Sequence, residues 1–525
     1  MISWKRPIIL PVWLTCSVAM AAFTPLCAQE RDTQNSTATP KPIRLTLNTN
    51  QKFQTIDNFG ASDAWSGQFV GQWPAIKKNA IADLLFSRDT LQNGQPAGIG
   101  LSLWRFNIGA GTAEQGEKSG IKDEWRRAQS FLNADGTYDW EKQKGQIWFL
   151  NAAKQRGVSQ FLGFTNSPPV FMTKNKKGYA DEDSSKIGIP NLSFTAIDQF
   201  THYLTEVTKG IHNKTGVMLD YLSPVNEPQW DWSNGNQEGT PFYNDQIAAI
   251  TRSLSKSLQK EGLPTKIDIA EAGQIDFLYG NHNKPAGRGY QVAEFFQQNN
   301  PYYIGGLSNV SQTISGHSYF TTSPSDLARN KRQQVAKAVQ SIPGLKYWMS
   351  EYCILGSNSG DINGNKRDLG IQPALYVAQV IHNDLVYAQA SAWHWWLAIS
   401  PYNYKDGLIY IDKNKNDGNF ESSKILWALG QYSRFILPGA KRIEVKISEQ
   451  NPDLLVSAYE NPNQEIVTVM INPTALPIAV TVEVAGKKLN NLRGYQTSSE
   501  GDLQPIEASN QMTISPQSII TLVGQ

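Results

Sequence analysis

Cysteine is scarce in this sequence. Three of the 525 residues are Cys, and two of these, Cys16 and Cys27, lie in an N-terminal stretch with the composition of a removable targeting segment. Once that stretch is removed only Cys353 remains, which excludes an internal disulfide bond. A chain of this length buries enough apolar surface to fold without such cross-links.

Histidine and excess charge are scarce as well. The six His residues are scattered without metal-ligand spacing, so the sequence predicts no metal site and no other cofactor. A formal net charge of +2 argues against nucleic acid or an anionic membrane as the main partner. The oligomeric state is left open, with a monomer as the simplest expectation.

Long apolar runs are missing beyond the N-terminus. Lys5 and Arg6 precede an apolar run at 8–23, and this pattern predicts a signal peptide over residues 1–28 and a secreted or periplasmic protein. A membrane anchor is the alternative, but Pro7 and Pro11 disfavour it. No later segment approaches the roughly 20 apolar residues of a spanning helix, so no membrane span is expected.

Strand-like and helix-like runs alternate through most of the chain, which predicts an α/β fold of the (β/α)8 barrel type. Residues 29–40 are predicted to be a linker, 41–50 a strand joining a β-sandwich, 51–437 the barrel and 438–525 the β-sandwich. A doubly wound open sheet is the rival, but no G-x-G-x-x-G follows an early strand. The expected barrel strands are 53–59, 100–108, 158–164, 219–225, 266–270, 312–317, 346–350 and 390–396.

Periodicity separates the two expected domains. Apolar residues recur every three or four positions at 197–211 and 245–259, which predicts helices packed on a sheet. After residue 439 this pattern gives way to short alternating runs such as 454–458 and 466–471, which predict the sandwich strands.

Polar and aromatic residues gather at the carboxyl ends of the expected strands, where barrel enzymes carry their reactive groups. Glu227 and Glu351 end the fourth and seventh strands, so they can face each other across the barrel mouth. Retaining glycoside hydrolysis needs such a carboxylate pair. The simpler alternative is that each glutamate only forms a salt bridge with a barrel arginine such as Arg105.

Five motifs in chain order, LWRFNIGAG, SPVNEP, SGHSY, WMSEY and WHWWLAIS, resemble glycoside hydrolase family 30. The runs QTIDNFGASDAW and SPPVFM resemble the same family at the first and third strands. The resemblance extends from about residue 43 to the C-terminus, so it implies a polysaccharide or oligosaccharide substrate and the barrel-plus-sandwich fold.

The resemblance implies a role for each matching residue. Glu227 is expected to be the general acid/base and Glu351 the nucleophile. Asn226 would bind the sugar 2-hydroxyl, Tyr319 would restrain the nucleophile, and Arg105 would keep it ionised.

Aromatic residues complete the expected site. Trp is abundant, with 15 copies, and its flat face can stack on sugar rings. Trp395 matches the aromatic floor of the reactive-sugar subsite, and Trp230 and Trp232 are expected to support the leaving-group sugars. Asp63 and Trp65 are expected to bind the same reactive sugar. His317 and Glu271 are expected to support the site without acting as catalysts.

The substrate is less well defined than the reaction. The opening FGASDAW looks like the endo-β-1,6-galactanase branch, which makes that activity the leading expectation. An endo-xylanase, a β-1,6-glucanase or an exo-β-glycosidase of the same family are the alternatives, and a non-catalytic carbohydrate-binding protein is a remote one. A phosphate-dependent barrel enzyme is disfavoured, because the region before residue 400 is rich in Trp where a Gly-rich phosphate loop would be needed.

Overall fold

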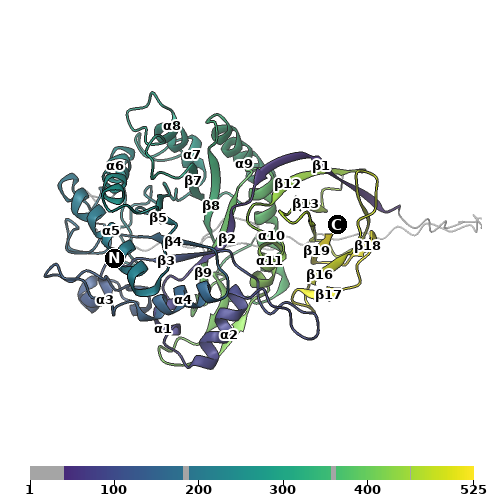
Figure 1. Ribbon diagram of the computed structural model, residues 1–525, viewed down its shortest axis with the longest axis horizontal. Helices are drawn as coiled ribbons and strands as arrows, with labels where there is room; N and C mark the ends of the chain where they lie inside the picture. Colours follow the sequence, from purple (N-terminus) through teal and green to yellow (C-terminus); the bar gives the residue numbers. More distant parts are fainter. Residues whose placement is uncertain (1–40, 181–187, 356–361, 450) are drawn as a thin grey trace, which may run out of the picture. The chain divides into compact units, whose positions relative to one another are not determined.

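Parallel strands organise the first 400 residues of the computed structural model, which describes residues 41–180, 188–355, 362–449 and 451–525 (Figure 1). The expected signal peptide and linker lie outside the described residues. Hydrogen-bonded ladders join β2 through β6 in order, then β7 to β8, β8 to β9 and β9 back to β2. Parallel bridges from Ile267 to Val310 and from Ala272 to Gly316 link β6 with β7 and close the barrel.

Each expected barrel strand overlaps one of these elements. Their bounds are β2 Asn58–Ser62, β3 Leu103–Asn107, β4 Gln160–Phe164, β5 Tyr221–Ser223, β6 Lys266–Ile267, β7 Thr313–His317, β8 Lys346–Tyr352 and β9 Ala392–Ser400. A short extension, β10 (Gly407–Ile411) and β11 (Phe420–Ser422), pairs beside β9. The predicted (β/α)8 fold is therefore confirmed.

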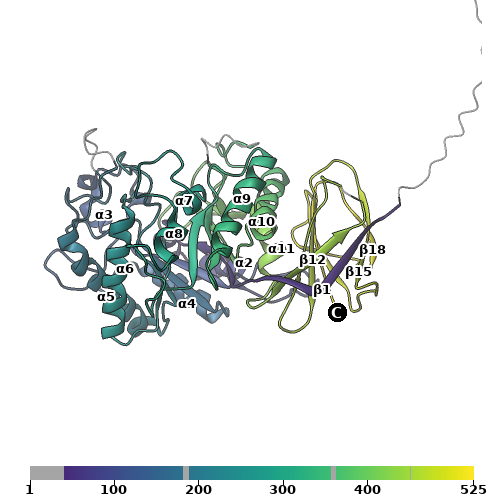
Figure 2. The same cartoon turned by 90° about the horizontal axis from the view of Figure 1, so that it is seen from above.

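Amphipathic helices surround the barrel (Figure 2). In α5 the buried residues Phe200, Leu204, Val207 and Ile211 recur at helical spacing, and Gly216 ends the helix with a φ of 65°. The longer helices are α2 Ala75–Phe86, α4 Lys144–Gln155, α5 Ile197–Thr215, α6 Asn244–Lys260, α9 Ser325–Gln340, α10 Ile371–Val386 and α11 Lys424–Ser433. The shorter ones are α1 Gly67–Val70, α3 Thr112–Gln115, α7 Asp276–Tyr279 and α8 Gln291–Phe296. Among the described residues, no helix combines the length and apolar character needed to cross a bilayer.

The C-terminal strands form the predicted β-sandwich. Nine strands follow the order β17-β16-β19-β14-β13-β12-β1-β15-β18 in the described part of the chain. Their bounds are β12 Lys441–Ile447, β13 Leu455–Glu460, β14 Ile466–Asn472, β15 Ile478–Val484, β16 Arg493–Thr497, β17 Gln504–Ile506, β18 Gln511–Ile514 and β19 Ser518–Gly524. A separate apolar core, which includes Leu45, Val480 and Ile520, fills this domain.

The N-terminal strand β1 (Ile43–Thr55) belongs to the sandwich and is longer than predicted. It pairs with β12 in antiparallel fashion and with β15 in parallel fashion. Thr55 still lies opposite Lys441, so residues 53–55, expected in the first barrel strand, extend β1 instead. The Ile56 N–H still donates to the Ala440 carbonyl, and the first barrel strand begins at Asn58.

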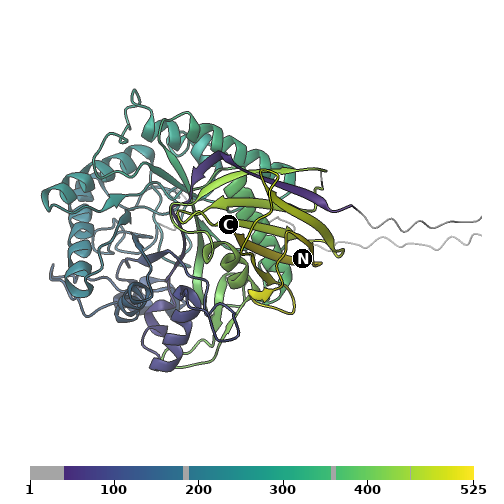
Figure 3. The same cartoon turned by 45° about the vertical axis from the view of Figure 1, so that its right-hand side comes forward.

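Helix α11 joins the barrel to the sandwich (Figure 3). The Gln431 side chain donates to Thr497 Oγ1 at 2.9 Å and to the Ile519 carbonyl at 3.1 Å, and Thr521 donates back to the Gln431 carbonyl. All these groups are buried. The sandwich therefore packs against the barrel helices α10 and α11.

Candidate active site

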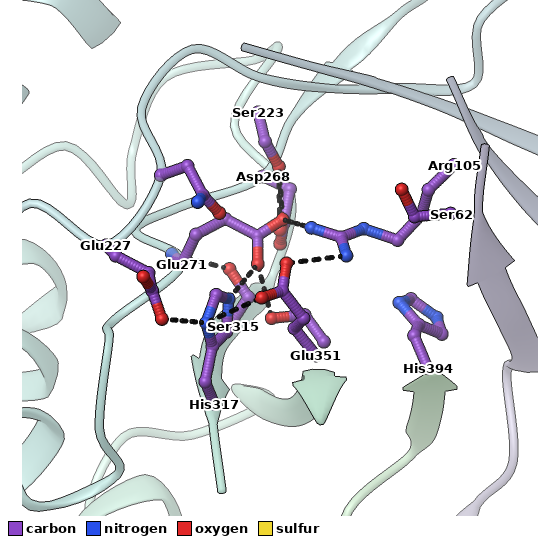
Figure 4. A network of polar contacts seen from close by, with 12 residues as sticks. Ser62, Arg105, Ser223, Glu227, Asp268, Glu271, Ser315, His317, Glu351 and His394 are labelled. Atoms are coloured by element: carbon purple, nitrogen blue, oxygen red, sulfur yellow. Dashed lines mark hydrogen bonds and ion pairs between the residues drawn. The ribbon is translucent and has the colours of Figure 1, made fainter. Parts of the chain in front are cut away.

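The carboxyl ends of the barrel strands bring five charged side chains into one hydrogen-bonded network (Figure 4). They are Arg105 on β3, Glu227 after β5, Glu271 after β6, His317 at the end of β7 and Glu351 on β8. None is more than 7% exposed. Buried charges need partners, and in this network each charged group lies against one of opposite sign.

Glu227 is held in an unusual backbone conformation just past β5. Its φ of 44° lies in the left-handed region, which costs a residue with a side chain roughly 1–2 kcal/mol. The Glu227 N–H bonds the Glu271 carbonyl at 2.8 Å and offsets part of that cost. Burial raises the pKa of the Glu227 carboxyl above its ordinary value, as does the charge of Glu351, while His317 opposes them.

Arg105 bridges two carboxylates beneath the cleft. Its Nη1 donates to Glu351 Oε2 and its Nη2 to Glu271 Oε1, both at 3.1 Å. Although burial raises the pKa of Glu271, the charges of Arg105 and His317 outweigh it and bring that pKa below its ordinary value. Glu271 is therefore a permanently charged support, and Ser350 and Ser223 also donate to it.

His317 lies between the three carboxylates. Its Nδ1 is 3.0 Å from Glu227 Oε1 and 3.6 Å from Glu351 Oε1, and its Nε2 is 3.0 Å from Glu271 Oε2. Burial alone would lower the pKa of His317, but the charge of Glu351 and the bonds to Glu227 and Glu271 raise it to about 10. The sequence analysis predicted that His317 supports the site without acting as a catalyst. A single His at the end of a strand gives no indication that its side chain contacts both glutamates.

Tyr319 and Asn226 adjoin the reacting pair. The Tyr319 hydroxyl donates to Glu351 Oε1 at 2.9 Å, and burial raises its pKa well above 10, so it remains a donor. The Asn226 Nδ2 donates to Asn166 Oδ1 at 3.0 Å, whereas Asn226 Oδ1 has no hydrogen-bond partner among the described residues. Asn226 lines the cleft, although its Oδ1 is itself covered by protein atoms.

The two glutamates are close enough to share one reacting centre. An oxygen of each carboxylate and a ring nitrogen of His317 all lie within 4.8 Å of one another. Such a trio has the donor types of a metal site. However, a doubly protonated His317 has no lone pair to offer, and the Arg105 charge already balances Glu351.

A cleft of about 570 Å³ opens above these groups. Trp230, Trp232 and Phe320 form its aromatic wall next to Glu227, and the Trp232 indole N–H bonds the Glu227 carbonyl at 3.0 Å. A second cavity of about 450 Å³ shares Trp396, Gln237 and Leu355 with the first, so the two lie side by side. The sequence identified Trp230 and Trp232 but not Phe320.

The structure corrects the expectation for Trp395. This residue is 0% exposed and its indole donates to the Asp406 carbonyl at 2.7 Å, so it has no face for a ligand. Alternate residues on a strand point to opposite sides, and Trp395 stacks with Trp393 on the outer side of β9. Trp396, on the inner side with His394, lines both cavities instead.

Trp65 and Asp63, both on the first loop, have different surroundings. Trp65 lines the second cavity, with its ring edge-to-face against Trp396 at 5.4 Å and the Arg126 guanidinium 5.1 Å from its centre. Asp63 is buried and accepts from the Asn107 N–H at 2.8 Å and the Gln146 side chain at 3.2 Å. Burial raises its pKa to about 7. Asp63 therefore bonds neighbouring protein groups and does not line the cleft.

Comparison with known sequences agrees with this arrangement. Residues 42–410 match O-glycosyl hydrolase family 30, and residues 439–522 match the glycosyl hydrolase family 30 beta sandwich domain. The chain belongs to glycoside hydrolase family 30. It is therefore an O-glycosyl hydrolase with a carbohydrate substrate.

Relatives of this glycoside hydrolase include enzymes of different specificity. An endo-beta-1,6-galactanase from Hypocrea rufa is 22% identical over 484 residues, which cover 89% of this chain and 85% of the relative. A conserved exported protein from Bacteroides fragilis is 31% identical, with a TM-score of 0.84 over 91% of this chain and 99% of that one. The catalytic domain of a xylanase from Talaromyces cellulolyticus has the same fold, with 21% identity and a TM-score of 0.66 over 92% and 100% of the two chains.

Proposed function

We propose that this enzyme cleaves β-linked polysaccharide with retention of anomeric configuration, with Glu351 as the nucleophile and Glu227 as the general acid/base. The observation that carries the proposal is the separation of the two carboxylates, which bring oxygens within 4.8 Å of each other from the ends of β5 and β8. Retaining enzymes place their carboxyl groups about 5–5.5 Å apart, whereas inverting enzymes need about 6.5–9.5 Å to admit a water.

The surroundings of the two glutamates support different roles. Burial and the nearby Glu351 charge favour the protonated form of Glu227, as an acid requires. Arg105 and Tyr319 donate hydrogen bonds to the two oxygens of Glu351, which orient its side chain for attack. In the first step Glu351 attacks the anomeric carbon while Glu227 protonates the departing oxygen, and in the second Glu227 deprotonates the attacking water.

Residues around the pair are suited to hold sugar rings. Asn226 lines the cleft beside the pair, where its side-chain amide can bond a hydroxyl of the reacting sugar, and Trp396 gives that sugar an apolar wall. Trp230 and Trp232 lie beside the acid/base, where the leaving-group sugars must bind.

The cleft favours cleavage within a chain rather than at its end. The two neighbouring cavities offer room for sugars on both sides of the scissile bond, which supports endo action. The similarity to an endo-beta-1,6-galactanase across most of the chain supports β-1,6-galactan as the substrate.

Product analysis tests both parts of the proposal. Purified protein would be incubated with β-1,6-galactan, glucuronoxylan, β-1,6-glucan and aryl β-glycosides, alongside Glu227→Gln and Glu351→Gln. Oligosaccharides from galactan, formed first as the β-anomer and abolished by either substitution, are expected. Cleavage of another polymer would reassign the substrate, α-anomeric first products would refute retention, and binding without cleavage would indicate a carbohydrate-binding protein.

We further propose that the enzyme is exported. The basic and apolar pattern of residues 1–28 supports this, as does the similarity to a protein described as exported. Mass spectrometry of the N-terminus after expression in a bacterium with two membranes would test it. A retained Met1 in the cytoplasmic fraction would refute the proposal.

A further inference from the structure

We propose that His317 is a positioning residue that remains a cation throughout the reaction, and that its Nδ1–H changes hydrogen-bond partner between Glu227 and Glu351 as the negative charge moves. The inference rests on the proposed double-displacement function. It concerns a residue that neither attacks nor protonates the sugar, but acts through both residues that do.

The geometry allows one proton donor to serve both carboxylates. Nε2 is anchored 3.0 Å from Glu271 Oε2, which fixes the ring, while Nδ1 faces Glu227 Oε1 at 3.0 Å and Glu351 Oε1 at 3.6 Å. The two Nδ1 distances, 3.0 and 3.6 Å, differ by 0.6 Å, so a movement of either glutamate side chain by more than this would exchange the nearer partner. The Tyr319 and His317 rings pack edge-to-face with their centres 5.7 Å apart, which limits movement of the imidazole.

The charges of the network balance before and after the first step. In the free enzyme Glu227 is protonated, so the negative Glu271 and Glu351 face the positive Arg105 and His317. Glu351 then forms a bond to the anomeric carbon, the glycosidic electron pair leaves with the departing oxygen, and that oxygen takes the Glu227 proton. Glu351 is now a neutral ester and Glu227 a carboxylate, so the network is still balanced.

The second step reverses this transfer. Water oxygen bonds to the anomeric carbon, its proton passes to Glu227, and the electron pair of the ester bond returns to Glu351. A cation that stays between the two sites stabilises both ionised states, whereas a neutral His317 would leave one buried carboxylate without an opposite charge at each stage. His317 need not gain or lose a proton at any point.

Other ionisable groups near His317 do not replace this function. Burial and the Glu271 charge raise the pKa of Asp268 to about 7, and the hydroxyls of Ser223 and Thr313 donate to it. Burial lowers the pKa of His394 to about 3, which leaves it neutral, and raises that of Cys353 well above 9. Arg105 contacts Glu351 and Glu271 from the opposite side and has no hydrogen bond to Glu227.

The first test reads the His317 proton directly and needs no substrate. Ring nitrogen shifts of protein labelled with nitrogen-15 histidine would be followed against pH in the wild type, E227Q, E351Q and the double variant, with H317Q used for assignment. Each single variant retains one ionisable partner, so His317 should stay doubly protonated at neutral and mildly alkaline pH. The double variant removes both, so the pKa of His317 should fall.

Two outcomes of this titration would overturn the proposal. A neutral His317 in the wild type at neutral pH would remove the cation altogether. An unchanged His317 titration in the double variant would show that Glu271 alone holds the charge and that the reacting pair is irrelevant to it. Because these spectra require no turnover, failure of the proposed glycosidase activity would be seen separately in the substrate panel.

The second test uses kinetics on whichever substrate the panel identifies. In H317Q the loss of the cation raises the pKa of Glu227, so the alkaline limb of kcat/KM should move to higher pH. The following step needs ionised Glu227, and each unit of increase in its pKa slows that step about tenfold on its acidic side. The glycosyl-enzyme should then accumulate and be found by mass spectrometry on Glu351.

A matched control separates this effect from loss of packing. His382, a buried histidine on α10 whose pKa burial lowers to about 3, would be replaced in H382Q. In this variant the pH dependence of kcat/KM should be the same as in the wild type. The proposal is wrong if H317Q has a lower kcat/KM with an unchanged pH dependence and accumulates no glycosyl-enzyme. His317 would then have a structural role.

Discussion

Replacing Arg105 by Gln should remove the cation that joins Glu271 to Glu351, and the effect on stability can be predicted from its contacts. Both ion pairs are 3.1 Å long, and the Arg105 and Glu271 side chains have no exposed surface. Breaking a buried pair by removing one partner costs about 3–5 kcal/mol, because the other charge stays buried without compensation. We expect a loss in this range for R105Q at neutral pH.

The loss of unfolding free energy in R105Q should become smaller as pH falls. In the native enzyme the pKa of Glu271 is held below its ordinary value, so this group contributes stability above the unfolded pKa of about 4.3 and loses it as pH falls. Without Arg105, His317 alone faces the buried Glu271 and Glu351, so the pKa of Glu271 should rise and R105Q should become relatively more stable as pH falls. The difference between wild type and variant should therefore shrink from pH 7 towards pH 5.

Urea unfolding of both proteins at several pH values would measure this difference. The surface pair between Lys77 and Asp417 provides a control, because K77Q should change the free energy of unfolding very little at every pH. A loss for R105Q no larger than that of K77Q, or one that does not change with pH, would refute the view that Arg105 balances two buried charges.

Further expectations follow from the cleft. Y319F removes the 2.9 Å bond to Glu351, and a bond to a charged group is worth about 1.5–3 kcal/mol, so kcat should fall roughly 10- to 100-fold with little change in unfolding. Trp396→Ala should raise KM, because this residue lines both cavities, whereas Trp395→Ala should leave KM unchanged and destabilise the fold by about 3–5 kcal/mol. Equal effects of the two Trp changes on KM would contradict the assignment of Trp396 to the cleft. EDTA should not reduce activity, since doubly protonated His317 cannot bind a metal; inactivation reversed by added metal would disprove this.

Much of the barrel could be predicted because its strands are short apolar runs that end in polar residues. Glu227 and Glu351 stood out for this reason, and the rule that barrel sites lie at strand ends placed them together. The C-terminal end of β1 was harder to predict. Residues 53–55 have a sequence typical of a strand, and this does not distinguish pairing with β12 from membership of the barrel.

Side-chain direction was the least predictable property. Assigning Trp395 to the cleft required knowing which face of β9 turns inward, and four aromatic or His residues in succession give no alternation from which to tell. A register irregularity against β2, between Ala61 and Ser62, lies at the same point. The contact of His317 with both glutamates likewise depends on distances between three strands, which no local pattern encodes.

The pairing of β1 with β12 and β15 has a consequence for how the chain is completed during synthesis. The strand β1 can pair in the sandwich only after β12 and β15, which lie about 400 residues further along the chain, have been synthesised. Until then Leu45 and Leu47 remain on a strand with free edges, which invites pairing with another chain. Truncation before residue 441 would therefore yield an aggregating product even though every residue of the cleft is present.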